Sequence, residues 1–167
     1  GRLAAQALLE GHHRDIGVIE LDPNDGEAAP GRRIGCRTYL EQAGIPWNTV
    51  HVAVGHGTTR DGYAAASRLL TDHPWLTGLV CGNDCMAMGA YAAIREQGLR
   101  VREDVAVIGI DDQELIADQV HPALTTVALP FEEMGQVAVS HLLALMEGEE
   151  VPAETLLPGT IIRRSSA

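Results

Sequence analysis

The chain has few basic residues for its size. Its 167 residues include 12 Lys and Arg against 23 Asp and Glu, which gives a formal net charge of −11. A surface with this balance repels the phosphates of nucleic acids. We therefore expect that this chain does not by itself bind DNA or RNA.

Cysteine and long apolar runs are also scarce. The cysteines, Cys36, Cys81 and Cys85, are odd in number, and two of them lie in or beside apolar runs, which favours reduced thiols in a cytoplasmic protein over a disulfide framework. No apolar run approaches the roughly 20 residues of a membrane span, and no signal peptide is present, so we expect no membrane partner. The chain begins within a helical pattern and without Met, which predicts a piece of a longer protein.

The motifs of several enzyme classes are absent. The sequence has no Gly-x-Ser-x-Gly elbow, no phosphate-binding glycine loop and no HExxH helix. Asp84, Asp111 and Asp112 leave an acid–base enzyme open as an alternative, but we expect that the protein is not an enzyme and has no cofactor. A metal site would need four histidines to converge, and we expect none to form. These histidines are His12, His13, His51 and His56.

What the chain does contain is a regular alternation of helical patterns and short apolar runs. Strands are predicted at 16–21, 50–54, 77–82 and 105–110, and helices at about 3–10, 32–43, 63–70 and 86–95, with a loop at 22–31. The strand cores carry apolar runs such as 105–110 instead of polar alternation, as expected when helices cover both faces of a sheet. The predicted fold class is α/β, a doubly wound parallel sheet.

Polar residues follow several of these strands. Asn83 and Asp84 follow the strand at 77–82, Asp111 follows the strand at 105–110, and Arg32 follows the loop after the first strand. In a parallel sheet such residues meet at one edge, where open α/β folds bind ligands. Amide, carboxylate and guanidinium groups suit a small ligand with hydroxyls or a heteroaromatic edge.

Helix capping is the alternative explanation for these residues, since Asx side chains commonly cap helices. It applies to Asp111 and Asp112 as well as to Asp84. For the Asn-Asp pair we predict that Asp84 caps the helix and that Asn83 faces the ligand cleft.

The segments "GNDCMAMGAYAAIREQGLRVREDVAVIGIDD", "HPALTTVALPFEEMGQVAVSHLLALMEGE" and "LPGTIIRRSS" resemble the carboxyl-terminal part of lactose/galactose-repressor-type transcription regulators. The resemblance implies an effector-sensing domain of the periplasmic-binding-protein type, with two lobes around a sugar or purine-like ligand. Operator DNA is then read by an amino-terminal helix-turn-helix that this chain lacks. A periplasmic sugar-binding component of a transporter has the same fold and is the alternative function.

The resemblance also divides the chain into segments. Residues 1–130 correspond to the carboxyl-terminal lobe of the effector-binding domain. Residues 131–155 form a helix that in the family returns to the amino-terminal lobe, and residues 156–167 are the terminal strand. Without that lobe, the apolar stripe of the helix at 131–147 is expected either to fold back on this lobe or to pair with another copy of the chain.

The resemblance assigns roles to individual residues. It implies that Arg32, Asn83, Asp111 and Phe131 contact the effector. The sequence departs from the family at Gly57, where many members have an aromatic residue. One stacking surface for the ligand is therefore missing.

The helix after the Asn-Asp pair faces its counterpart in the family's dimers. Met88, Tyr91 and Arg95 lie at helical spacing and are the predicted homodimer interface. The alternative is that this stripe faces the core of its own chain.

Overall fold

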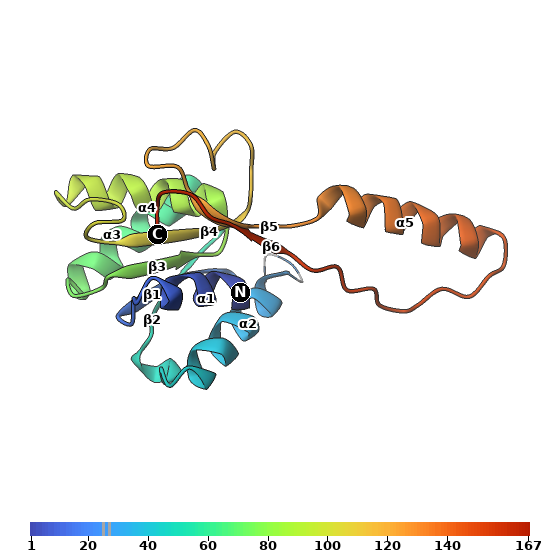
Figure 1. The fold of residues 1–167 in the computed structure, drawn as a ribbon, viewed down its shortest axis with the longest axis horizontal. Helices are drawn as coiled ribbons and strands as arrows, with labels where there is room; N and C mark the ends of the chain where they lie inside the picture. The colour runs from blue at the N-terminus through green and yellow to red at the C-terminus, as the bar shows by residue number, and fades with distance from the viewer. Residues whose placement is uncertain (25, 27) are drawn as a thin grey trace.

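The computed structural model describes residues 1–24, 26 and 28–167, and its main body is a six-stranded sheet between two helical layers (Figure 1). The strand order is β2-β1-β3-β4-β5-β6. All neighbours are parallel except β5 and β6, which are antiparallel. In chain order the elements are α1 (Arg2–Glu10), β1 (Ile16–Leu21), α2 (Ala28–Gln42), the short helix η1 (Trp47–Thr49), β2 (His51–Gly55), α3 (Thr59–Asp72), β3 (Gly78–Cys81), α4 (Asp84–Glu96), β4 (Ala106–Asp111), β5 (Thr125–Ala128), α5 (Phe131–Met146) and β6 (Thr160–Ile162).

Each face of the sheet is covered by its own pair of helices. Ile16 and Val18 of β1 pack with α1 and α2, whereas Ile19 packs with α3 and α4. Side chains of a strand alternate between the two faces of a sheet, so both faces of β1 must be apolar. The predicted doubly wound α/β fold is confirmed, with one antiparallel strand added at the edge.

Glycines let α3 and α4 approach closely. A Cβ at Gly62 would lie 2.2 Å from the carbonyl oxygen of Met86, and one at Gly89 would lie 2.0 Å from that of Thr59. Such distances leave no room for any side chain. The two helices therefore pack backbone against backbone, which fixes the position of α4 over the sheet.

The second helix begins earlier than predicted. We predicted a loop to residue 31 and a helix from Arg32, but α2 begins at Ala28. Pro30 lies in its first turn, where the missing N–H has no helical partner to lose. The prediction was wrong at this boundary, and Arg32 consequently projects from an ordered helix.

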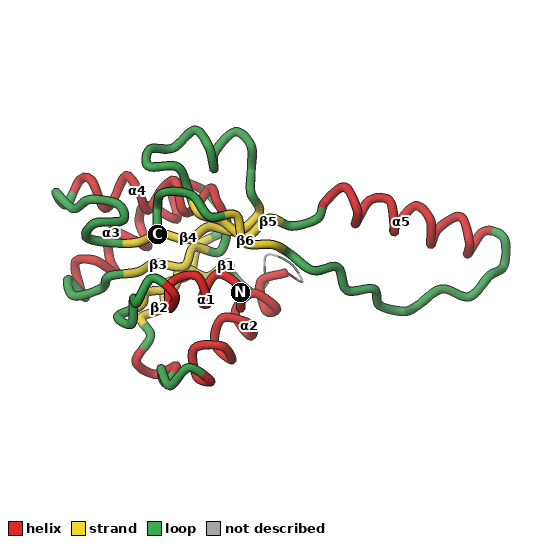
Figure 2. The backbone as a smooth tube through the Cα atoms, viewed as in Figure 1, coloured by secondary structure: helices red, strands yellow, loops and turns green. Residues whose placement is uncertain are grey.

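The helix α5 projects away from the body on the two connecting segments of the chain (Figures 1 and 2). None of its residues is buried, and Leu142, Leu143 and Met146 are more than half exposed. The expectation that this helix folds back on the lobe is therefore wrong. Pairing with another copy stays a prediction. Among the described residues, no helix combines the length and the apolar character that crossing a membrane requires.

Candidate functional site

Two of the predicted ligand-binding residues meet at the carboxyl edge of the sheet. Arg32, near the start of α2, and Asp111, the last residue of β4, form an ion pair with Nη2 and Oδ1 2.7 Å apart. Arg32 also donates through Nη1 to the carbonyl oxygen of Gly82 at the end of β3. The side chains of Arg32 and Asp111 are 19% and 14% exposed, so the pair is mostly buried but still reaches the surface.

Burial and charge act in opposite directions on Asp111. Burial raises the pKa of this carboxyl group, while the Arg32 guanidinium and the hydrogen bond from Gln113 lower it. The backbone φ of Asp111 is 121° and that of Asp112 is 57°, a region that L-residues rarely adopt. The chain thus turns sharply after β4, and the turn directs the Asp111 carboxylate toward α2.

Asn83, not Asp84, caps the helix α4. Its Oδ1 accepts from the N–H of Met86 at 2.8 Å, and its Nδ2 donates to the carbonyl oxygen of Gly57 at 2.9 Å. The assignment of the cap to Asp84 was wrong because Asn83 has the extended backbone of an N-cap, with φ of −155°. Its amide thereby ties the end of β3 to the loop after β2.

Asp84 instead lies inside the molecule. It is 0% exposed and accepts hydrogen bonds from the Thr126 hydroxyl at 2.6 Å and from the N–H of Gln113 at 2.8 Å. Burial raises its pKa to about 6 despite these hydrogen bonds, and the nearby carboxylates of Asp111 and Asp112 add to the rise. Sequence reasoning missed this role, because a cap and a buried acceptor are both acidic residues at a helix start.

Phe131 lies apart from the other predicted ligand-binding residues. It begins α5 and is 57% exposed. Within the described part of the chain, no hydrogen bond, ion pair or ring contact joins it to Arg32, Asn83 or Asp111. The structure brings together Arg32 and Asp111, and it places Asn83 at the same sheet edge.

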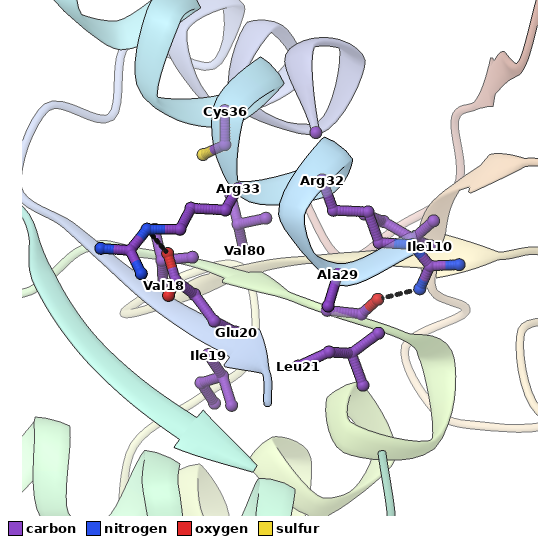
Figure 3. Close-up of a pocket in the computed structure, with 12 residues that line it drawn as sticks. Val18, Ile19, Glu20, Leu21, Ala29, Arg32, Arg33, Cys36, Val80 and Ile110 are labelled. Atoms are coloured by element: carbon purple, nitrogen blue, oxygen red, sulfur yellow. Dashed lines mark hydrogen bonds and ion pairs between the residues drawn. The ribbon is translucent and has the colours of Figure 1, made fainter. Parts of the chain in front are cut away.

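A small cavity of about 20 Å³ lies beneath α2, next to Arg32. In Figure 3, Glu20 points toward Arg33 while Arg32 extends toward Ile110 at the end of β4. The Oε1 of Glu20 is 3.5 Å from Nε of Arg33, and burial raises the pKa of this carboxyl group. Burial also raises the pKa of the Cys36 thiol to about 12, so this thiol stays protonated. The signal for Glu20 in the sequence was a single acid within an apolar strand.

The predicted dimer residues divide between the core and the surface. Tyr91 is 2% exposed, and its hydroxyl donates to the carbonyl oxygen of Pro122 at 2.9 Å. The core-facing alternative therefore holds for Tyr91, which supports the helix from within. Met88 is partly exposed, and Arg95 is exposed and donates to the carbonyl oxygen of His121.

The histidines considered for a metal site do not gather. His51 stacks on His73 with ring centroids 3.5 Å apart. His51 begins β2, so the stack lies at the amino edge of the sheet, opposite the carboxyl edge that holds the Arg32–Asp111 pair. Among residues 1–24, 26 and 28–167, no group of three or more His, Cys, Asp or Glu is arranged to hold a metal ion.

Comparisons with known proteins identify the family of this chain. Residues 5–167 match the family described as "Periplasmic binding protein-like domain". The transcriptional repressors PurR of Yersinia pestis bv. Antiqua (strain Antiqua) and of Yersinia pseudotuberculosis (strain YPIII) are each 39% identical over 171 residues, covering 100% of this chain and 49% of the relative. The chain thus spans about half the length of the curated relatives it matches.

Solved structures of repressors have the same fold. The lac repressor bound to ONPG superposes with a TM-score of 0.91 and 31% identity, over 99% of this chain and 49% of that one. A complex of the regulator CelR with cellobiose gives a TM-score of 0.92 and 34% identity, over 99% and 50% of the two chains. The chain therefore belongs to the family of periplasmic-binding-protein-like domains, in the form found in lactose/galactose-repressor-type transcription regulators, and the resemblance in its sequence is confirmed.

Proposed function

We propose that this chain is the effector-sensing and dimerisation portion of a DNA-binding transcriptional regulator, and that Arg32 and Asp111 bind its effector. The observation that supports this most directly is their ion pair at the carboxyl edge of the sheet. Ligands of open α/β folds bind at this edge. The regulator acts in the cytoplasm and reads operator DNA through a helix-turn-helix outside these residues. Its role is binding, not catalysis.

The chemistry of the pair favours a sugar or a nucleobase-like effector. Asp111 can accept from ligand hydroxyl or N–H groups, and Arg32 can donate to ligand oxygens or ring nitrogens. A ligand with donors and acceptors side by side satisfies both side chains at once. Among related regulators, the lac repressor has been solved bound to ONPG and CelR in a complex with cellobiose, which is a sugar.

We assign Asn83 and Phe131 secondary roles at this site. The Asn83 amide is engaged with Gly57 and Met86, so it shapes the cleft and has limited capacity left for a ligand. Phe131 stands at the start of α5, where an aromatic ring would border a ligand once a second lobe covers the cleft.

The exposed apolar helix α5 supports the proposal that the protein has a second lobe. Residues 131–155, which include α5, leave the body, and residues 156–167 return to it. None of the residues of α5 is buried. A helix with this much exposed apolar surface requires a partner. We propose that an amino-terminal lobe, outside these residues, packs on α5 and closes the cleft over residues 1–130.

We propose a homodimer through α4. Met88 and Arg95 provide surface positions, and the buried Tyr91 holds the helix against the loop at 121–122. Met and Arg are both enriched in protein interfaces.

The test is a thermal-shift screen of the full-length protein with cellobiose, galactosides, purine bases and nucleosides. A ligand that binds only the native state raises the melting temperature, and Asp111→Ala should abolish that rise. The matched control is Asp104→Ala, which removes a partly exposed carboxylate paired with the exposed Arg100. A rise that survives Asp111→Ala would remove the pair from the site.

A further inference from the structure

Asp84 joins several elements of the site through one buried carboxylate. It begins α4, its Oδ1 accepts from Thr126 of β5 at 2.6 Å, and its Oδ2 accepts from the N–H of Gln113 at 2.8 Å. Gly109 of β4 leaves space for it, because a Cβ there would lie 2.1 Å from Oδ1. The carboxylate is thus enclosed by α4, β4, β5 and the chain that follows β4.

The backbone that Asp84 holds is an unusual one. Asp111 and Asp112 have φ angles of 121° and 57°. The N–H of the following residue, Gln113, donates a hydrogen bond to the Asp84 carboxylate. Such angles persist in L-residues only when the surroundings impose them. Asp112 is also paired with Arg164 at 2.8 Å through its side chain, and the Gln113 carbonyl oxygen accepts from the N–H groups of Ile116 and Ala117. The Asp84 carboxylate holds the N–H side of the same residue.

We infer that Asp84 is a positioning residue of the effector site: by accepting the Gln113 N–H, it holds the turn at 111–112 and keeps the Asp111 carboxylate against Arg32. The inference rests on the proposed function only in taking that ion pair as the effector site. The contact requires hydrogen-bonding geometry and does not require charge. An Asn at this position offers an oxygen to Gln113 and an N–H to the Thr126 hydroxyl, so it can replace both bonds.

Hydrogen–deuterium exchange of the full-length protein tests this without a ligand. Two segments are followed by mass spectrometry: residues 111–117, which contain the Gln113 amide, and residues 28–42, which form α2 and contain Arg32. Asp84→Ala should raise exchange in both segments, by on the order of tenfold at Gln113 since the hydrogen bond that protects this amide is lost. Asp84→Asn should restore exchange close to the wild-type rate.

A double variant asks whether Asp84 acts through Asp111. Asp111→Asn alone should raise exchange in α2, because Arg32 loses its ionic partner. If Asp84 only positions Asp111, adding Asp84→Ala should raise exchange in α2 no further. A general loss of core packing would add to the effect instead. Asp104→Ala is the surface control and should leave both segments unchanged.

Three results would overturn the inference. These are equal effects of Asp84→Ala and Asp84→Asn, an unchanged α2 in Asp84→Ala, and additive effects in the double variant. If Asp84→Ala does not accumulate as folded protein, Asp84→Ser takes its place, since its hydroxyl is too short to reach the Gln113 amide. The proposed function fails separately, in the ligand screen with Asp111→Ala, so the two failures are distinguishable.

Discussion

Arg32 and Asp111 are 79 residues apart in the chain, yet their charged groups lie 2.7 Å from each other at the carboxyl edge of the sheet. The contact exists because α2 packs against β1, and the Arg32 side chain reaches past the Gly82 carbonyl, after β3, to the end of the next strand, β4. It connects a helix on one face of the sheet to a strand end that a tight backbone turn orients.

The ion pair should contribute to stability as a coupled unit. In a double-mutant cycle with Arg32→Met and Asp111→Asn, we expect a coupling on the order of 1–2 kcal/mol in the free energy of unfolding, because both side chains are mostly buried. Urea denaturation of the four proteins measures it. The same double-mutant cycle on the more exposed Arg100–Asp104 pair is the matched control. It should give a much smaller coupling than the Arg32–Asp111 cycle. Equal couplings would show that burial does not strengthen the Arg32–Asp111 pair.

Removing the helix cap should destabilise the protein measurably. Asn83→Ala loses the acceptor for Met86 N–H and the donor to Gly57, and we expect a cost of about 1–2 kcal/mol in the free energy of unfolding. Asn83→Asp keeps the acceptor and loses the donor, so it should cost less. If the Asp variant is as unstable as the Ala variant, the bond to Gly57 matters more than the cap.

The close approach of α3 and α4 predicts opposite effects for two Gly→Ala substitutions in helices. Gly89→Ala places a methyl group 2.0 Å from the Thr59 carbonyl oxygen and should destabilise the protein by roughly 1–3 kcal/mol or more, since the helices must separate. Gly135→Ala in α5 meets no atom within 4 Å and should stabilise by roughly 0.5–1 kcal/mol. Thermal denaturation distinguishes the two. A tolerated Gly89→Ala would contradict the close packing of these helices.

The buried carboxyl of Asp84 predicts a specific pH dependence. Its folded-state pKa of about 6 lies above the ordinary 3.8, so its contribution to stability is fully present below pH 3.8 and is lost as the pH rises through about 6. The loss amounts to roughly 2–3 kcal/mol. Asp84→Asn removes this titration. The difference in unfolding free energy between wild type and Asp84→Asn should therefore fall over this pH window and stay level above it, and a constant difference would contradict the raised pKa.

The proposed dimer predicts a change in association state. Met88→Asp places a charge on the exposed side of α4 and should shift the full-length protein from dimer to monomer, as measured by light scattering. Thr71→Asp, at the exposed end of α3, is the control and should remain dimeric. An unchanged dimer in Met88→Asp would place the interface elsewhere.

Local patterns in the sequence determined the order and type of the elements. Apolar runs such as 105–110 are typical of strands buried on both faces, and the strand-to-helix junctions placed Arg32, Asn83 and Asp111 near one edge. The start of α2 was missed because a proline in a first turn resembles a loop in sequence while fitting a helix in structure.

Tertiary structure decided which polar residue does what. Asn83 and Asp84 are adjacent and both suited to capping, and only the packing of β5 and the turn after β4 shows that Asp84 is the buried acceptor. Likewise, helical spacing placed Tyr91 on a stripe, and only the loop at Pro122 shows that this stripe is partly buried. Periodicity follows from local geometry, whereas burial and hydrogen-bond partners depend on segments that are distant in sequence and meet only when the sheet assembles.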